Sequence, residues 1–264
     1  MKRFIPSDGS RMRRRSPSSP FGGESLRIGS LRGSTARGVP VEIPPHTVML
    51  RGAGLDSNVY LVRSGREALV IDTGTGLHWH AYAEVWKREG YLDGVDKAII
   101  FNTHEHFDHV GGNWALKGWF EGRGIEVLFA AHEETARTLE RGDDYVILSH
   151  FYGRRFEPQR VDIHLKDGDN LEVGSLELEL VHTPGHTAGS ACLYLNGEVK
   201  LAFTGDTLFK GTAGRTDLPT GNAGELRKSL ERLLGYDVDF GLPGHGWVIE
   251  DWRGNLEGVL RWLR

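Results

Sequence analysis

Short apolar runs recur along the chain after Val39, and most of them end at glycine, proline or aspartate. Such runs predict β-strands, whereas apolar residues spaced three or four apart predict amphipathic helices. In the first half, this pattern predicts strands at 46–52, 57–62, 68–71, 97–101 and 125–130. It also predicts helices at 82–88 and 111–120 and a helical stretch with a loop at 132–153.

The second half repeats this alternation of strands and helices. Its apolar runs predict strands at 161–165, 170–173, 176–182, 190–195, 199–204 and 240–242. Helices are predicted at 224–234 and 252–263. Two strand-rich blocks, each with its own helices, predict two packed sheets with helices on the outside, which is an α/β fold.

The length of 264 residues allows one large domain or two small ones. No apolar run approaches the roughly 20 residues that a membrane-spanning helix needs, so no membrane partner is expected. Cys192 is the only cysteine, which excludes an intrachain disulfide and favours a reducing, cytoplasmic location. Because it lies within a predicted strand, we expect it to be a small buried side chain rather than a ligand or nucleophile.

Charge is unevenly distributed along the sequence. Residues 1–40 contain nine Lys or Arg and two acidic residues, a net charge of +7, whereas the remainder has a net charge of −11. The acidic remainder disfavours nucleic-acid binding. Residues 1–40 lack apolar periodicity and are predicted to be a disordered, solvated tail; the alternatives are a basic arm for nucleic acid or an acidic surface, and a wrongly assigned start codon. No apolar core follows the arginines, so a signal peptide is not expected.

A cluster of candidate metal ligands directly follows the predicted strand that ends at Phe101. His104, His106, Asp108 and His109 lie within six positions and precede a Gly-Gly turn. A loop at the end of a strand can bring several side chains to one point. Neutral imidazoles and carboxylates are suitable ligands for zinc, iron or manganese. A metal site is therefore favoured over a polar loop with surface histidines.

Three further candidate ligands follow later strands. His186 follows a Pro-Gly turn, Asp206 follows an apolar strand and a glycine, and His245 again follows Pro-Gly. Any one of these residues alone would be typical of an ordinary turn. Four strand ends of this kind in one chain favour a single shared metal site.

The His-x-His-x-Asp-His motif and the order of the three later ligands resemble the metallo-β-lactamase-fold superfamily. The resemblance extends from about His46 to Arg264, and Asp72 matches a structural aspartate of that superfamily. It implies an αββα four-layer sandwich with metals at one edge. The implied organisation is a basic tail at 1–40 and one domain at 41–264.

The resemblance also implies roles for the candidate ligands and two divalent metal ions, zinc first, with iron or manganese as alternatives. One metal is expected on His104, His106 and His186, the second on Asp108, His109 and His245, and Asp206 is expected to bridge them. A hydroxide between the metals is the implied nucleophile, which attacks a carbonyl while Asp108 orients it and accepts a proton. Glu105 and Phe107 are assigned no catalytic role.

The segments Thr204–Phe209 and Gly211–Gly221 resemble the glyoxalase II-like group, which hydrolyses S-acyl thioesters. A small-molecule thioester is therefore the expected substrate. Only nineteen residues follow His245, too few for the helical domain that binds glutathione in longer members, so another thiol carrier is an open alternative. Arg215 and Asp217 either contact the substrate or pair with each other.

Other activities on the same scaffold remain open. Persulfide dioxygenases share a similar Gly-Arg-Thr-Asp segment and use one iron, here on His104, His186 and Asp206. The presence of Asp108, His109 and His245 favours hydrolysis, of a thioester or of a lactone. β-Lactamases have Cys or Ser at the position of Asp206, so that activity is not expected. A metal-stabilised binding module without catalysis is the alternative of a different class.

Overall fold

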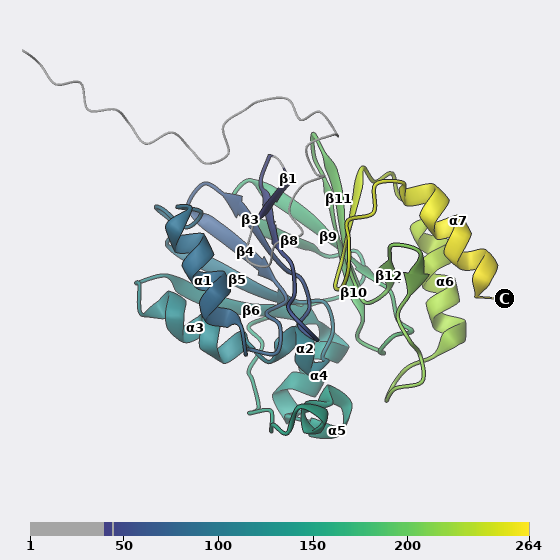
Figure 1. Ribbon diagram of the computed structural model, residues 1–264, viewed down its shortest axis with the longest axis horizontal. Helices are drawn as coiled ribbons and strands as arrows, with labels where there is room; N and C mark the ends of the chain where they lie inside the picture. Colours follow the sequence, from purple (N-terminus) through teal and green to yellow (C-terminus); the bar gives the residue numbers. More distant parts are fainter. Residues whose placement is uncertain (1–39, 44, 264) are drawn as a thin grey trace, which may run out of the picture.

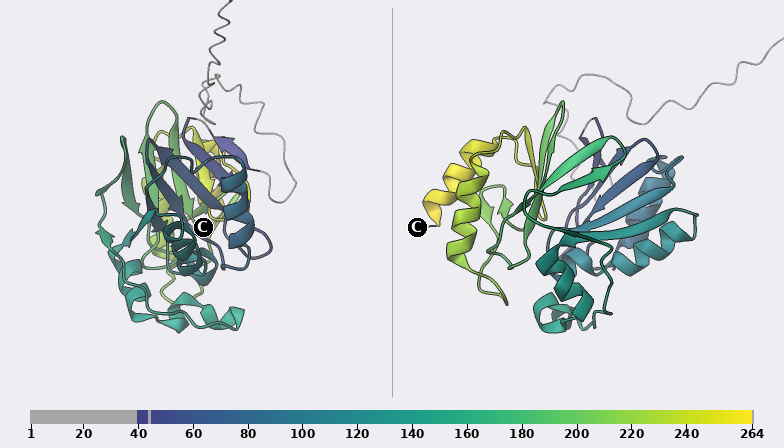
Figure 2. Two further views of the ribbon diagram at one scale, coloured as in Figure 1. Left: turned by 90° about the vertical axis from the view of Figure 1, so that its left-hand side faces the viewer. Right: turned by 180° about the vertical axis from the view of Figure 1, so that it is seen from behind.

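The computed structural model describes residues 40–43 and 45–263, so the predicted tail lies outside the described residues apart from Pro40. Two β-sheets lie face to face in the centre of the molecule, with helices on both outer sides (Figure 1). The right-hand view of Figure 2, from behind, shows the same order of layers. The predicted αββα sandwich is thus confirmed. Among the described helices, none is long and apolar enough to span a bilayer.

The first sheet has seven strands in sequence order. They are β1 (Val41–Ile43), β2 (Thr47–Leu50), β3 (Val59–Ser64), β4 (Glu67–Ile71), β5 (Lys97–Asn102), β6 (Glu126–His132) and β7 (Ile163–Leu165). Strands β1 to β4 are antiparallel neighbours, and β4 to β7 are parallel. Parallel neighbours end at the same edge of a sheet, which places the loops after β4, β5 and β6 together.

The second sheet has the order β14-β11-β10-β9-β8. Its strands are β8 (Asn170–Val173), β9 (Leu176–His182), β10 (Ala191–Asn196), β11 (Lys200–Gly205) and β14 (Phe240–Pro243). Strands β11 and β14 are parallel, and the other pairs are antiparallel. A separate hairpin consists of β12 (Leu208–Phe209) and β13 (Thr212–Ala213).

Helices cover the outer face of each sheet. The first sheet packs against α1 (Trp79–Arg88) and α3 (Asn113–Glu121), and the second against α6 (Ala223–Leu233) and α7 (Trp252–Trp262). A buried core that includes Phe101, Leu193 and Phe203 fills the space between the sheets. Apolar side chains from α4 (Glu133–Arg141) and α5 (Asp144–Ile147) form a smaller cluster with Phe107.

The predicted helices and strands are all present, with small shifts at their ends. The helix predicted to start at Gly111 begins at Asn113, and its N-cap Gly112 packs against Thr73, where an added Cβ atom would lie 2.3 Å from the carbonyl oxygen of Thr73. The stretch 132–153 forms α4, α5 and the 3₁₀ helix η2 (Ser149–Tyr152). The sequence analysis missed three short strands, β1, β12 and β13, and the four-residue helix α2 (Phe107–Val110).

Candidate metal centre

The histidine motif spans the loop after β5 and the short helix α2, which contains Asp108 and His109, and Asp72 fixes the start of that loop. Asp72 follows β4, and its carboxylate accepts hydrogen bonds from the backbone N–H and the hydroxyl of Thr103, at 2.9 and 2.8 Å. Its Oδ2 lies 2.7 Å from Nδ1 of His109. Because a carboxylate only accepts, Nδ1 of His109 donates, and Nε2 is left facing the centre.

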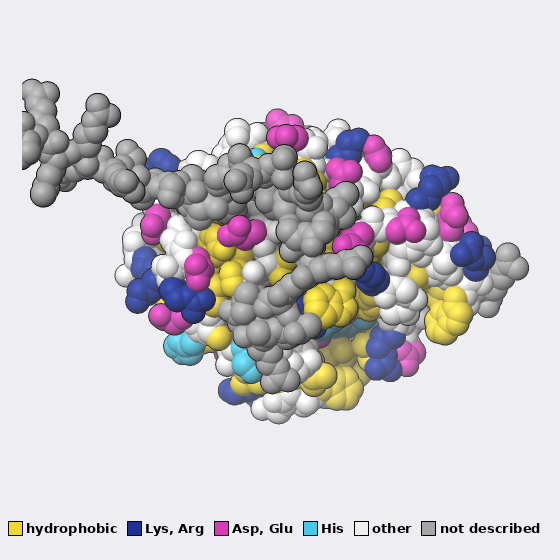
Figure 3. Space-filling model, turned by 45° about the horizontal axis from the view of Figure 1, so that its top comes forward, with side chains coloured by type: hydrophobic (Ala, Val, Ile, Leu, Met, Phe, Trp, Pro, Cys, Tyr) yellow, Lys and Arg dark blue, Asp and Glu magenta, His cyan; other side chains and the backbone are white. Residues whose placement is uncertain are grey.

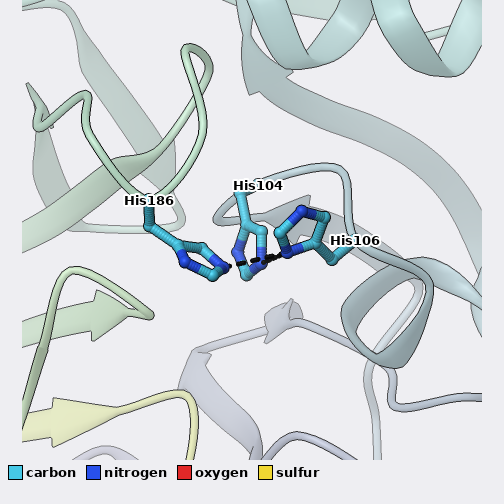
Figure 4. Close-up of side chains that lie close together, drawn as sticks. All are labelled: His104, His106 and His186. Carbon is cyan, nitrogen blue, oxygen red and sulfur yellow. Dashed lines mark hydrogen bonds between the residues drawn. The ribbon is translucent and has the colours of Figure 1, made fainter. Parts of the chain in front are cut away.

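Three imidazoles converge from two different sheets. His104 and His106 come from the loop after β5, and His186 comes from the loop between β9 and β10 (Figure 4). Nδ1 of His106 lies 3.2 Å from Nε2 of His104 and 2.9 Å from Nε2 of His186. All three side chains are almost fully buried. Such a group of nitrogen atoms can hold one metal ion.

A second group lies beside the first. Nε2 of His245 lies 3.2 Å from both Nε2 of His109 and Oδ2 of Asp108. The Asp206 carboxylate lies between the two groups, with Oδ1 3.2 Å from Nε2 of His109 and Oδ2 3.6 Å from Nε2 of His186. The seven residues predicted from the sequence are therefore all brought together at one edge of the sandwich.

Burial and mutual repulsion keep His104 and His106 uncharged. Burial lowers the pKa of His104 well below its usual value, and His109 and His106 lower it further. Burial, together with the neighbouring His186, lowers the pKa of His106 to about 3. Neutral imidazoles have a free lone pair, which is the form that coordinates a metal.

The carboxylates of Asp206 and Asp108, in contrast, are held in their charged form. Burial raises the pKa of Asp206, but the charges of His109 and His245 outweigh this and hold it well below its usual value. Burial likewise disfavours a charged His109, yet Asp206 and Asp72 raise the pKa of His109 well above its usual value. The ionised carboxylates thus require nearby positive charge, which a divalent cation can supply.

The donor set fits a metal-binding centre. Oδ1 of Asp206 is a buried carboxylate oxygen without a hydrogen-bond partner, and the Asp206 carboxylate lies within 4 Å of imidazole nitrogens of His109, His186 and His245. An unpartnered buried carboxylate oxygen is costly, and coordination to a cation would satisfy it. The ligand atoms form three overlapping groups, each within 4.8 Å. Mixed nitrogen and oxygen donors of this kind suit zinc, iron or manganese.

The loop that contains His186 is shaped by its neighbours. Nδ1 of His186 lies 2.7 Å from the carbonyl oxygen of Arg215, which directs Nε2 towards the centre. Gly185 has a φ of +140° and packs against α6, where an added Cβ atom would lie 2.3 Å from backbone atoms of Leu226. Only glycine combines this conformation with so close an approach.

Glu105 holds the same loop from the other side. Its buried carboxylate accepts hydrogen bonds from the hydroxyls of Thr187 and Thr135, both at 3.0 Å. Thr187 is the neighbour of His186 in the sequence, and Thr135 lies on α4. Glu105 therefore joins the histidine motif to two elements of its surroundings, although it does not face the metal-ligand groups.

Asn58 and Tyr60, in and next to β3, fix the loop that contains His245. These two residues were not predicted from the sequence. Nδ2 of Asn58 and the hydroxyl of Tyr60 donate to the carbonyl oxygen of Pro243, at 2.9 and 2.7 Å. The Asn58 backbone N–H also donates to Gly244. These bonds join residues about 185 positions apart, and an asparagine and a tyrosine in a strand region give no signal of such contacts in a single sequence.

The other predicted residues have clear surroundings. The Arg215 guanidinium forms two hydrogen bonds of 2.7 Å with the Asp217 carboxylate, so the two side chains pair with each other. Arg215 also lines the cavity above the centre. Cys192 is buried in β10, as predicted, and its thiol lies beside Thr183 and the Thr204 carbonyl.

Comparisons with known proteins agree with this geometry. The model of the metallo-beta-lactamase superfamily matches residues 52–245. A probable metallo-hydrolase of Methanocaldococcus jannaschii is 36% identical over 204 residues, covering 75% of this chain and 92% of that protein. A human acyl-coenzyme A thioesterase is 30% identical over 219 residues, covering 73% and 74%. A crystal structure in a di-iron-bound form matches with a TM-score of 0.62 and 25% identity, covering 80% of this chain and 95% of the other.

Proposed function

Since the chain belongs to the metallo-beta-lactamase superfamily, we propose that it is a two-metal hydrolase that cleaves thioesters. The observation that supports two metals best is the arrangement of the ligand groups. His104, His106 and His186 form one group, and Asp108, His109 and His245 form another. The Asp206 carboxylate lies between them, in the position of a bridging ligand.

In this proposal, His104, His106 and His186 would hold one ion and Asp108, His109 and His245 the other, with the Asp206 carboxylate available to both. Zinc is the first metal to test, with iron or manganese as alternatives. When bound, two such ions supply a water of lowered pKa and polarise the carbonyl of the substrate. Asp72 keeps His109 in the orientation that this arrangement needs.

Asp108 has a second role in the proposed reaction. Its carboxylate lies at the floor of an open cavity, with Oδ2 3.2 Å from Nε2 of His245. From there it can orient the attacking water and accept its proton as the carbonyl carbon is attacked. The thiolate then leaves, and the acid is released. A thiolate is a good leaving group, so the reaction needs little assistance at the sulfur.

A thioester is the favoured bond for two reasons. The human relative is an acyl-coenzyme A thioesterase, and residues 204–221 resemble the glyoxalase II-like group. We further propose that the substrate is a small molecule. A chain with one cysteine favours a reducing location, and we propose the cytoplasm.

Metal analysis combined with a substrate panel tests the proposal. We expect about two metal ions per chain and hydrolysis of at least one S-acyl thioester, followed by release of free thiol. If the protein holds a single iron and consumes oxygen when a persulfide is added, the proposal is wrong and the protein is a persulfide dioxygenase. Hydrolysis of lactones but of no thioester would agree with the proposed metal-dependent hydrolysis and would show that a thioester is not the substrate.

The variant Asp108→Ala tests whether the centre is catalytic. It removes a ligand and the proton acceptor, so we expect kcat/KM for a thioester to fall at least about 100-fold. Asp93→Ala is the control, because Asp93 is exposed and precedes β5 at the end of the strand far from the centre. Equal turnover by the two variants would contradict a catalytic role for Asp108, and no turnover of any thioester or lactone by the wild type would indicate a metal-stabilised binding module instead of an enzyme.

A further inference from the structure

We infer that the acyl group of the substrate is an apolar chain and that it binds against the aromatic side chains of η2. This inference rests on the proposed thioester hydrolysis and adds the substrate class. It starts from the cavity above the candidate metal centre, which has a volume of about 460 Å³. That volume is within the range of ordinary small-molecule sites.

The cavity has a polar floor and apolar walls. The floor consists of side chains from the candidate metal centre: His106, Asp108, His186, Asp206 and His245. The walls are formed by large apolar or aromatic side chains: Leu55, Leu148, Phe151, Tyr152, Phe209 and Leu218. A substrate whose carbonyl lies on this floor must therefore place the rest of its acyl group against hydrocarbon. Figure 3 shows hydrophobic side chains gathered beside a hollow in one face of the molecule.

Two wall residues are unusually exposed for their type. Leu55 is 70% exposed and Phe151 is 68% exposed. Large apolar side chains that stay in water next to a polar catalytic floor are typical of a ligand-binding surface. An acyl chain placed between them would remove apolar area from water on both the ligand and the protein.

The aromatic wall is attached directly to the ligand motif. The Tyr152 ring contacts the ring of Phe107, with centroids 5.2 Å apart, and Phe107 lies between His106 and Asp108 in the sequence. Leu148, at the start of η2, has a φ of +64°, which is uncommon for leucine. The Phe151 N–H donates a hydrogen bond of 3.0 Å to the carbonyl oxygen of Leu148. Such uncommon backbone conformations gather at functional sites, and here the conformation presents Phe151 to the cavity.

Charge at the cavity also favours a neutral acyl group. Arg215 is the cationic side chain in the wall, and its guanidinium is already bound to Asp217 through two hydrogen bonds. A carboxylate in the acyl group would have to compete with Asp217 for this guanidinium. It would also lie near the carboxylates of Asp108 and Asp206.

A series of acyl thioesters of one thiol tests the inference. We use N-acetylcysteamine thioesters of acetate, butanoate, hexanoate, octanoate and lactate with the metal-loaded full-length protein. Burial of each methylene should raise kcat/KM by about fourfold until the cavity is filled. We expect octanoyl to exceed acetyl by at least about 100-fold, and lactoyl to lie near acetyl.

Variants of two neighbouring aromatic residues, Phe151 and Tyr145, locate the acyl site. Phe151→Ala removes the exposed wall and should lower the ratio of octanoyl to acetyl kcat/KM by about tenfold, and Phe151→Leu should restore most of it. Tyr145→Ala is the matched control, since Tyr145 is on the adjacent α5, is 69% exposed and does not line the cavity. It should leave the ratio unchanged.

The outcomes separate the inference from the function on which it rests. Failure of the wild-type protein to hydrolyse any of the five thioesters overturns the proposed function. Hydrolysis without a rise from acetyl to octanoyl, or with lactoyl as the best substrate, overturns the apolar acyl site alone. A chain-length preference that Phe151→Ala leaves intact, or that Tyr145→Ala reduces equally, also overturns this placement.

Discussion

The orientation of His109 depends on a residue that would bind no metal itself. Asp72 accepts from Nδ1 of His109 and from both hydrogen-bond donors of Thr103, so it fixes one imidazole and the start of the histidine loop together. Asp72 has a φ of +58°, a conformation that asparagine tolerates well. Asparagine is therefore a replacement that tests the carboxylate without straining the backbone.

We expect Asp72→Asn to weaken metal binding by about 10- to 100-fold. The asparagine side chain has one acceptor oxygen instead of two, so its N–H₂ donor can face His109 in place of the carboxylate oxygen. Competition with a chromogenic chelator measures the affinity, and circular dichroism checks that the fold is kept. Asp93→Asn is the control, since its side chain is exposed and distant from the centre. Unchanged affinity in Asp72→Asn would show that the carboxylate does not tune His109.

Glu105 is a second residue with a structural effect on the centre. Glu105→Ala leaves the buried hydroxyls of Thr135 and Thr187 without this acceptor, so we expect the free energy of unfolding to fall by about 1–3 kcal/mol. Urea unfolding measures this loss. Glu134→Ala, which removes an exposed ion pair with Arg137 on α4, should cost less than about 1 kcal/mol. Equal losses in the two variants would contradict the proposed role of the buried carboxylate.

At this scale, the sequence indicated the candidate metal ligands and, through the resemblance, the supporting Asp72, but not the other residues that support them. Histidine and aspartate at strand ends are recognisable from spacing and chemistry alone. The roles of Asn58, Tyr60 and Glu105 depend on which loops meet in the folded chain. Phe151 gave no signal for the same reason, because its exposure beside the cavity is a property of tertiary structure.

The elements of secondary structure deliver the ligands by means of tight turns. The β9–β10 loop brings His186 to the centre only because Gly185 can approach α6 closely. Gly65, in the hairpin between β3 and β4, also has a positive φ, of +59°, but has open space around its Cα. Gly185 therefore combines a φ that essentially only glycine adopts with a steric clash, whereas Gly65 has the milder strain of the left-handed helical region alone.

We expect Gly185→Ala to reduce the free energy of unfolding by clearly more than the roughly 1 kcal/mol that positive φ costs an alanine. The added methyl group must displace α6 or the His186 loop, so metal affinity should fall as well. Gly65→Ala should show the conformational cost alone, with metal affinity unchanged. Urea unfolding and metal competition measure both effects. Equal behaviour of the two variants would show that the loop moves without penalty.

Strands and helices in which apolar residues recur with a clear period were predictable from the sequence, and very short elements were not. Strands β8 and β9 have the predicted bounds, because their apolar residues alternate cleanly between turns. Strands β12 and β13 have two residues each, too few for any period to be visible. Their pairing comes from the surrounding loop rather than from local preference.

On the scale of the whole molecule, the candidate centre joins two halves of the chain. His104, His106, Asp108 and His109 follow β5 of the first sheet, whereas His186, Asp206 and His245 follow strands of the second. The two-sheet architecture was predictable from the repeated strand-rich blocks. The packing of the two sheets and a single shared metal site were likewise predicted from these blocks and from the four strand ends with candidate ligands, whereas the assignment of each ligand to one of two metals followed only from resemblance to a known fold.

A centre shared between two sheets should couple metal binding to global stability. Metal bound only to the native state stabilises it by about 2.7 kcal/mol when free metal is at 100 times its Kd. For a domain of this size, chelation should therefore lower Tm by roughly 5–10 °C. Differential scanning calorimetry before and after dialysis against a chelator measures the shift, and restored metal should reverse it.

The double variant His186→Ala/His245→Ala provides the control for this coupling. It removes two of the three candidate ligands that follow strands of the second sheet and leaves Asp206, so any metal that remains would join the sheets through a single ligand. Its Tm should be lower than that of the metal-loaded wild type and nearly insensitive to chelator. If wild type loses its metal, as shown by elemental analysis, and keeps its Tm, the two sheets are held together by the apolar core between them and the centre contributes chemistry alone.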